Sequence, residues 1–175
     1  RYLIVSGNVA ARKDLIHQLK DYQVIITSYP LLRKDISYYQ DVQFNHCFLD
    51  EAQYIKNPSS LNARTVKLLR AKTRYALTGT PMENSLDELW SIFDFVMPGM
   101  LLSHYKFRET YEIPIIKDEN KAVKKKLIKR IKPFILRRMK SDVLTELPDK
   151  IESKFTIDLS NEQKELYLAT LEETR

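Results

Sequence analysis

The sequence predicts an α/β protein, in which part of a parallel sheet with helices on both faces is followed by a mainly helical segment. In residues 1–97, short apolar runs alternate four times with stretches of helical periodicity. The runs are continuously apolar, as in parallel strands that helices cover on both sides. Beyond "MPGML" at 97–101, no clear strand pattern follows through residue 150. The sheet therefore belongs to the first part of the chain.

Four short runs have the composition of strands, since they are rich in β-branched and aromatic residues. These predicted strands cover residues 2–5, 24–28, 44–49 and 75–77. Apolar side chains recur between and after them at helical spacing. The corresponding predicted helices cover residues 10–20, 30–36, 61–69 and 86–97. Pro30 suits a first helical turn, and Ser85 with Glu88 forms a capping box at the start of the fourth helix.

In the second part of the chain, the sequence pattern predicts helices but no strands. Residues 121–131 combine many basic side chains with an apolar stripe, and Pro133 ends this helix. Ser160 and Gln163 form a second capping box, which opens a helix that runs toward Glu173.

The bulk composition is that of an ordinary globular chain. Of its 175 residues, 43% are hydrophobic and 30% are charged. No run of about 18 apolar residues predicts a membrane span, and the start resembles no secretory leader. Because the chain opens with Arg1 inside a predicted strand, we expect a piece of a longer protein. The one cysteine, Cys47, lies in an apolar run and predicts a buried, inert thiol in a reducing cytoplasm, nucleoid or nucleus.

Positive charge is concentrated in one segment. The net charge is +6, yet residues 121–140 hold ten Lys or Arg and no acid, so the rest of the chain has a net charge of −4. Such asymmetry indicates an acidic polymer or an acidic protein surface as partner. The alternative is that these side chains form a solvated helix face.

A pair of carboxylates follows the third predicted strand. Asp50 and Glu51 stand where the apolar run 44–49 ends, and ligands bind at the carboxyl ends of parallel strands. Magnesium takes oxygen ligands and keeps several waters, so Asp50 suits a metal ligand and Glu51 a group that polarises water. The alternative is that both acids only begin a helix, where they suit its dipole.

A turn after the fourth predicted strand brings further polar groups to the same sheet edge. Thr78 and Thr80 flank Gly79, which permits a tight turn, and their hydroxyls can relay hydrogen bonds. The alternative is an ordinary strand-to-helix turn that Pro81 ends. In the helix that follows, large apolar residues predict core rather than site; they are Leu89, Trp90 and Phe93.

A phosphate-binding loop is missing from the sequence. Such a loop needs G-x-x-x-x-G-K-[ST], and none of the three glycines, Gly7, Gly79 and Gly99, precedes a lysine. The carboxylates therefore lack their nucleotide cradle within these residues. One interpretation is a module that binds nucleic acid or protein without hydrolysing a nucleotide.

Four stretches in order resemble the Swi/Snf-like DNA-translocating ATPases of helicase superfamily two. They are "ITSYPLLRKDI", "LDEAQYIKNPSS", "ALTGTPMENSLDELWSIFDFVMPGML" and "PFILRRMKSDVLTELPDKIE". The resemblance runs from about residue 1 to residue 167. It implies a RecA-like fold that binds ATP and magnesium between two lobes and moves along duplex DNA. An RNA helicase or a restriction-type motor is the alternative within the superfamily.

The resemblance also implies roles for individual residues. Asp50 and Glu51 match the Walker B element, with Asp50 as the magnesium ligand, and Gln53 stands where many relatives have histidine. Thr78, Gly79 and Thr80 match the motif that couples the nucleotide to DNA. Residues matching or neighbouring the DNA-binding and inter-lobe segments are Ser28, Tyr29, Lys124, Lys125, Lys126, Arg137, Arg138 and Lys140.

The resemblance divides the chain into three segments. Residues 1–99 correspond to the C-terminal part of the first lobe, residues 100–135 to a helical protrusion, and residues 136–175 to the bridge toward the second lobe. The phosphate loop and the arginine finger lie outside these segments in the family. We therefore expect duplex DNA and the second lobe as partners, no membrane partner, and neither bound cofactor nor ATPase activity for this piece alone.

Overall fold

A computed structural model describes residues 1–80, 85–138 and 153–173. The chain forms two compact units, residues 1–133 and 134–175, and each is described by itself. Lys140, one of the predicted residues, lies outside the described part. Among the described helices, none has the length and apolar character needed to cross a membrane.

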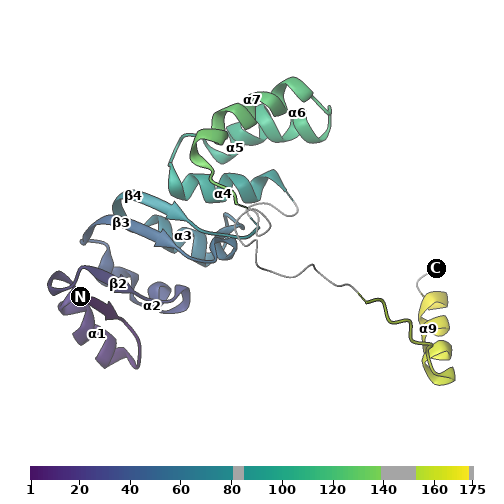
Figure 1. The fold of residues 1–175 in the computed structure, drawn as a ribbon, viewed down its shortest axis with the longest axis horizontal. Helices are drawn as coiled ribbons and strands as arrows, with labels where there is room; N and C mark the ends of the chain where they lie inside the picture. Colours follow the sequence, from purple (N-terminus) through teal and green to yellow (C-terminus); the bar gives the residue numbers. More distant parts are fainter. Residues whose placement is uncertain (81–84, 139–152, 174–175) are drawn as a thin grey trace. The chain divides into compact units, whose positions relative to one another are not determined.

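The strands of the first unit pair in parallel, as the sequence predicts (Figure 1). β1 (Tyr2–Ile4) pairs with β2 (Val24–Ile26). β3 (Gln43–Leu49) pairs with β4 (Arg70–Ala76), and Phe48 lies opposite Tyr75. β4 begins earlier than predicted, because its first residues alternate Arg and Lys with small side chains and so lack the apolar run on which the prediction relied.

Three helices connect these strands. α1 (Val9–His17) begins at Asn8, whose side chain accepts a hydrogen bond from the N–H of Ala11. α2 (Tyr29–Tyr39) has a proline in its first turn, and α3 (Leu61–Lys67) is capped by Ser60. α1 and α2 are joined by a buried ion pair, in which Arg12 donates to both carboxylate oxygens of Asp35 at 2.6 and 2.9 Å. This pair fixes the two helices against each other.

Strands and helices share one apolar core, which includes both strand pairs. Its most enclosed side chains are Val5, Tyr39, Ala52, Ile55, Ala63, Val66 and Phe95. Cys47 packs against this core but is only half-buried, so the prediction of a buried thiol holds in part. Burial raises the pKa of the Cys47 thiol, which keeps it protonated and unreactive.

One side of the strands is exposed within the described residues, which differs from the expectation of cover on both faces. Tyr2, Ile4, Val24, Ile26 and Phe48 are all about half exposed or more. The Phe48 and Tyr75 rings stack on this side with centroids 4.6 Å apart. The continuous apolar composition of the strands is explained if further chain covers this face in the complete protein.

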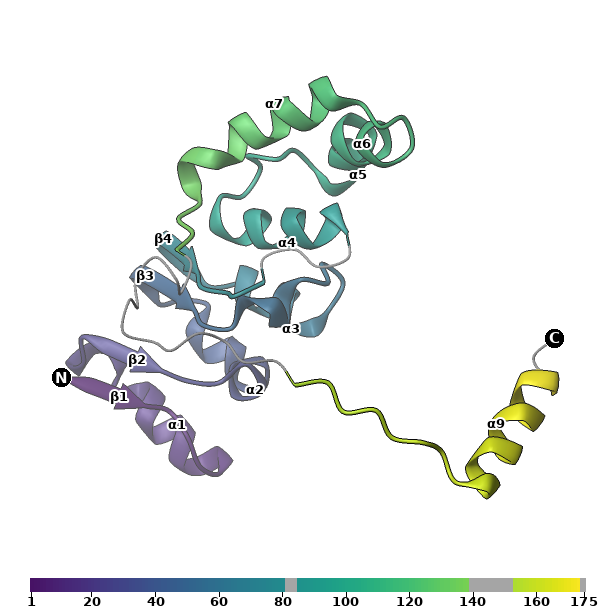
Figure 2. The ribbon, with the colours of Figure 1, turned by 45° about the vertical axis from the view of Figure 1, so that its right-hand side comes forward.

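A helical layer follows the strands in the first unit. It consists of α4 (Leu86–Val96), α5 (His104–Phe107), a π-helical turn (Arg108–Glu112), α6 (Ile113–Ile116) and α7 (Lys121–Ile131). Figures 1 and 2 both show α4 between the β3–β4 pair and the other helices of this layer. A second apolar cluster holds the layer together, and its members are Leu89, Trp90, Phe93, Leu101, Phe107, Tyr111, Leu127 and Ile131.

The sequence predicted α4 and α7 of this layer, but not α5, the π-helical turn or α6. Leu89, Trp90 and Phe93 are buried, as expected. Ser85 precedes α4, but its side chain makes no capping hydrogen bond, so the predicted capping box is incomplete. Glu88, the other member of the predicted box, lies 3.6 Å from Lys56 Nζ through its Oε2.

The second unit contains α9 (Asn161–Glu173). Its predicted capping box is confirmed, because Ser160 N–H donates to Gln163 Oε1 at 3.1 Å and Gln163 N–H donates to Ser160 Oγ at 3.3 Å. The proposed three-segment division of the chain, with a boundary at residue 99, stays a prediction.

Candidate functional site

The predicted carboxylates and the predicted turn meet at the carboxyl end of the β3–β4 pair. Beyond the strands, Leu77 N–H donates to the Leu49 carbonyl, and Ala52 N–H donates to the Leu77 carbonyl, both at 2.8 Å. These two bonds continue the parallel pairing past Leu49 and Ala76. They place Asp50 and Glu51 beside residues 78–80, as the sequence predicted for one sheet edge.

Asp50 has the geometry of a ligand for a hydrated cation. It is exposed, and its Oδ1 accepts a hydrogen bond from Glu51 N–H at 2.9 Å. Its Oδ2 has no hydrogen bond with the described residues. No group of three or more His, Cys, Asp or Glu side chains gathers in the described part of the chain. A single carboxylate suits magnesium, which keeps waters and takes phosphate oxygens for its remaining positions.

Glu51 combines an unusual backbone with a held side chain. Its φ of 49° and ψ of 52° lie in the left-handed region, which is costly for a residue with a Cβ. Its Oε2 accepts a hydrogen bond from Gln53 Nε2 at 2.6 Å. Strain of this kind persists only where neighbouring groups impose it, and it occurs most often at functional sites.

Gln53 connects Glu51 with the turn after β4. While its Nε2 donates to Glu51, its Oε1 accepts from Thr78 Oγ1 at 3.0 Å. Thr78 Oγ1 in turn accepts from Thr80 N–H at 3.1 Å. A neutral amide supplies the donor and the acceptor that this position needs. The residues Glu51, Gln53, Thr78 and Thr80 are called the coupling network below. Gly79 is exposed between the two threonines.

The coupling network is connected to α4 through Lys56, which sequence reasoning missed. Lys56 Nζ lies 3.5 Å from Thr80 Oγ1 and 3.6 Å from Glu88 Oε2. A second contact fixes the same helix, because buried Ser91 donates to the Ile55 carbonyl at 2.6 Å. A lysine six residues after Asp50 carried no recognisable signal, since exposed lysines are common.

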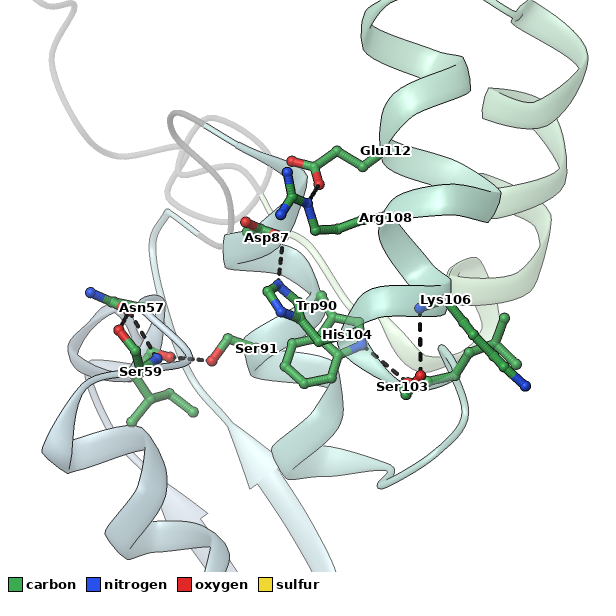
Figure 3. A network of polar contacts seen from close by, with 12 residues as sticks. Asn57, Ser59, Asp87, Trp90, Ser91, Ser103, His104, Lys106, Arg108 and Glu112 are labelled. Atoms are coloured by element: carbon green, nitrogen blue, oxygen red, sulfur yellow. Dashed lines mark hydrogen bonds and ion pairs between the residues drawn. The ribbon is translucent and has the colours of Figure 1, made fainter.

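The first turn of α4 also contacts the helical layer. His104 Nε2 lies 2.9 Å from Asp87 Oδ1 (Figure 3), and the centroids of the His104 and Trp90 rings are 4.7 Å apart. Trp90 Nε1 donates to the Leu102 carbonyl at 3.2 Å. Adjacent residues of α4 therefore face two ways, with Glu88 toward the coupling network and Asp87 toward α5.

A pocket of about 480 Å³ opens beside the coupling network. It is lined by Gln53, Tyr54, Lys56, Asn57, Pro58, Ser85, Asp87 and Glu88. The lining mixes polar and apolar side chains and carries both signs of charge. Because it joins the segment after Glu51 to the start of α4, a group that enters it would contact both.

The predicted DNA-binding residues Ser28 and Tyr29 stand at the start of α2. Ser28 is exposed, and its side chain makes no capping hydrogen bond. It lines a pocket of about 300 Å³ together with Ser6, which comes from the end of β1. Hydroxyls at a helix N-terminus suit phosphate oxygens. Sequence reasoning missed Ser6, because only the β1–β2 pairing brings it near Ser28.

The Tyr29 side chain contacts the backbone of Asp50 instead. Its hydroxyl donates to the Asp50 carbonyl at 2.9 Å, and its ring contacts that of Tyr54 at 5.5 Å. Burial raises the pKa of Tyr29 to about 12, with smaller electrostatic contributions from the nearby Cys47, Asp50 and Glu51. The phenol therefore stays a neutral donor at physiological pH.

The remaining predicted DNA contacts lie apart from this edge in the sequence. Lys124, Lys125 and Lys126 are exposed on α7 of the first unit. Arg137 and Arg138 are exposed in the second unit. Among the described residues of the first unit, no hydrogen bond or ion pair joins the three lysines to the coupling network. Lys140 lies outside the described residues.

Known proteins resemble the whole chain. A family model described as the SNF2-related domain matches residues 1–175. The chain is 38% identical to the TATA-binding protein-associated factor MOT1 of Saccharomyces cerevisiae, over 96% of the chain and 10% of that protein. It is 42% identical to the putative ATP-dependent helicase/translocase YwqA of Bacillus subtilis, over 92% of the chain and 18% of that protein.

A solved structure agrees with these matches. It is described as the Sulfolobus solfataricus SWI2/SNF2 ATPase core in complex with dsDNA. The likeness has a TM-score of 0.74 at 39% identity, and it covers 99% of this chain and 36% of that one. The chain thus spans between a tenth and a fifth of the two curated relatives and about a third of the structural one.

Proposed function

The chain belongs to the SNF2-related domain family, and we propose that it forms part of the first lobe of a DNA-dependent ATPase. The complete protein would hydrolyse ATP to move along duplex DNA and remodel proteins bound there. The coupling network carries this proposal, because it joins a candidate catalytic carboxylate to the turn after β4 through an unbroken series of hydrogen bonds.

In this proposal the two carboxylates have different tasks. Asp50 would hold magnesium through its exposed carboxylate, and the ion would neutralise charge on the phosphate oxygens when bound. Glu51 orients the attacking water and accepts its proton as the water oxygen approaches the γ-phosphorus. Because Gln53 fixes one carboxylate oxygen at 2.6 Å, the other oxygen is the acceptor. Catalysis then depends on positioning.

The coupling network would transmit the state of the nucleotide to the rest of the lobe. Any rotation of the Glu51 carboxylate changes its hydrogen bond with Gln53. A movement of the Gln53 amide then changes the hydrogen bond to Thr78, which also accepts from Thr80. Lys56 extends the path to α4 through Glu88. Gln53 thus fills the role of the histidine found in many relatives, without a charge that titrates near neutral pH.

Duplex DNA is the proposed track. Ser28 and Tyr29 belong to the segment that would follow the DNA backbone, and Ser6 adds a hydroxyl beside Ser28. The exposed bases that add nonspecific attraction are proposed to be Lys124, Lys125, Lys126, Arg137, Arg138 and Lys140. The three segments, residues 1–99, 100–135 and 136–175, would form the lobe, its protrusion and the bridge to the second lobe.

Hydrolysis needs parts that this sequence does not contain. It has no phosphate loop, and the second lobe with its arginine finger would be a further partner. We therefore expect residues 1–175 alone to release no phosphate, with or without DNA. Phosphate release by this piece above that of its Glu51→Gln variant would contradict the assignment.

The deciding experiment compares full-length protein with its Glu51→Gln variant. The exchange keeps the size of the side chain and removes the proton acceptor, so DNA-stimulated turnover should fall by at least about a thousandfold. ATP binding should persist. Asp50→Asn should also weaken magnesium-dependent ATP binding. Steady-state phosphate release and equilibrium binding of a fluorescent ATP analogue measure the two effects.

Three outcomes would contradict the proposal. Near-normal turnover of Glu51→Gln would show that another residue accepts the proton. A full-length wild type without DNA-stimulated hydrolysis would favour a non-catalytic binding module. An RNA-dependent but DNA-independent ATPase would point to the RNA helicases.

A further inference from the structure

The Tyr29 hydroxyl makes a contact that neither a DNA-binding role nor simple packing requires. It donates to the backbone carbonyl of Asp50 at 2.9 Å, although 21 residues separate them in sequence. Tyr29 is the first residue of α2 and directly follows Ser28, the helix N-cap. One residue thus connects the segment proposed to follow DNA with the peptide that bears both carboxylates.

Backbone hydrogen bonds from Tyr54 N–H to the Glu51 carbonyl and from Ala52 N–H to the Leu77 carbonyl hold that segment, and three further bonds involve side chains. Tyr29 binds the carbonyl of Asp50, the Asp50 side chain binds the N–H of Glu51, and Gln53 binds the Glu51 carboxylate. The bonds enclose the residue with the left-handed backbone, Glu51. Because this conformation is unfavourable by itself, the surrounding bonds must impose it. Tyr29 supplies the one that comes from α2.

α2 can carry a displacement from Ser28 to this bond. The Arg12–Asp35 ion pair fixes the middle of the helix to α1, and both side chains are almost fully buried. The first turn, which holds Ser28 and Tyr29, lies away from that pair. A phosphate bound at Ser28 would restrict this turn and, through it, the Tyr29 ring.

We propose that Tyr29 is a positioning residue that transmits DNA occupancy at the start of α2 to Glu51. The proposal rests on the function proposed above. DNA bound at Ser28 holds Tyr29 so that its hydroxyl fixes the Asp50 carbonyl, and the fixed peptide holds the Glu51 carboxylate in its productive direction. Tyr29 touches neither ATP nor the attacking water. Its effect is on the fraction of time that Glu51 spends correctly oriented.

Two properties of Tyr29 support this role over direct phosphate binding. Its hydroxyl is already engaged by a carbonyl oxygen, and its ring is half-buried against Tyr54. The group also remains a neutral donor across the working range, because its pKa is about 12. The coupling should therefore not weaken between pH 6 and pH 9.

The test uses Tyr29→Phe in the full-length protein, with Tyr38→Phe as the matched control. Tyr38 lies on the same helix, is 41% exposed and has no hydrogen bond to the carboxylate peptide. For Tyr29→Phe, kcat at saturating duplex DNA should fall about three- to tenfold, in line with one lost hydrogen bond. KM for ATP should stay within about twofold, and turnover without DNA should fall less than turnover at saturating DNA. Tyr38→Phe should match wild type throughout.

Each alternative result overturns the coupling role. A weaker Kd for DNA with full stimulation at saturation would make Tyr29 a DNA contact. An equal fall with and without DNA would make it a structural support of the carboxylates. If none of these quantities changes, the Tyr29 hydrogen bond has no role in turnover. Failure of the proposed function is recognised separately, because wild type would then lack DNA stimulation or Glu51→Gln would keep its turnover.

Discussion

The carboxylate edge of the sheet and the basic helix α7 differ in how their polar side chains are held. At the edge, Glu51, Gln53, Thr78 and Thr80 bind one another at 2.6 to 3.1 Å. On α7, Lys124, Lys125 and Lys126 are exposed, while Leu127 and Ile131 are buried beneath. The edge fixes the directions of its side chains, and the helix fixes only where charge is concentrated.

This difference separates two kinds of function. Proton transfer needs an acceptor within hydrogen-bond reach of its water, so a misdirected carboxylate loses activity. Attraction to a polyanion needs charge density, and long side chains can adapt to each phosphate. We therefore expect substitutions at the edge to act through geometry, and those on α7 to act through charge and ionic strength.

Among the variants that test this comparison, the largest effect is expected from breaking the network at Gln53. Gln53→Leu removes both of its hydrogen bonds and frees the Glu51 carboxylate, so DNA-stimulated turnover should fall about ten- to a hundredfold. Gln43→Leu, an exposed exchange in the same region of the chain, is the control and should have little effect. Steady-state phosphate release by the full-length protein is the measurement. Equal turnover for the two variants would show that the network is dispensable.

Gln53→His refines this prediction through pH. A neutral imidazole can donate to Glu51 and accept from Thr78, so activity should be retained at pH 8. Below a pKa of about 6.5, the imidazolium donates from both nitrogens and can no longer accept from Thr78. The ratio of variant to wild-type turnover should therefore fall as the pH decreases through that value. A ratio that does not change between pH 5.5 and 8 would argue against the Thr78 contact.

The sequence predicted the elements of the lobe because their apolar patterns are local. Leu89, Trp90 and Phe93 were recognisable as core from helical spacing, and the Ser160–Gln163 cap from residue types alone. Asp50 and Thr78 were expected at one edge because parallel strands end together. The family and the α/β class predicted from these patterns are confirmed by the comparisons.

The remaining features depend on contacts between distant segments. Tyr29 and Asp50, or Lys56 and Glu88, meet only after the chain folds, and no local pattern indicates their pairing. The Ser85–Glu88 capping box was predicted from local sequence, but Ser85 makes no capping hydrogen bond, and Glu88 Oε2 lies 3.6 Å from Lys56 Nζ. The exposed strand face was likewise unpredictable, since composition does not say which residues will cover it.

A middle-sized effect is expected from reversing the charges on α7. Changing Lys124, Lys125 and Lys126 to Glu should weaken duplex binding about tenfold at moderate salt if this face contacts phosphates. The slope of log Kd against log salt should decrease by up to about 2.7, or about 0.9 for each lost contact. Fluorescence anisotropy of the full-length protein across a salt titration measures both quantities.

The control for α7 reverses three exposed bases elsewhere, Arg64, Arg70 and Lys72, and so changes the net charge equally. If both triple variants lose the same affinity, the effect comes from net charge and the α7 face has no special contact. If the α7 variant keeps its slope, this face is only solvated, and Arg137 and Arg138 become the next candidates.

The smallest effect is expected where the two regions are connected, in the first turn of α4. Glu88 reaches Lys56 and the coupling network, whereas neighbouring Asp87 binds His104 in the helical layer. Glu88→Gln keeps the shape but weakens a largely buried ion pair, so DNA-stimulated turnover should fall about two- to fivefold. Asp87→Asn makes the same chemical change at a half-exposed pair and should leave turnover unchanged, at a stability cost below about 1 kcal/mol. Phosphate release and thermal melting of both full-length variants measure these effects.

If the two variants lose turnover equally, α4 responds as a whole, and Lys56 has no separate coupling role. If only Glu88→Gln loses turnover, the path from the carboxylates enters α4 through the Glu88 side chain.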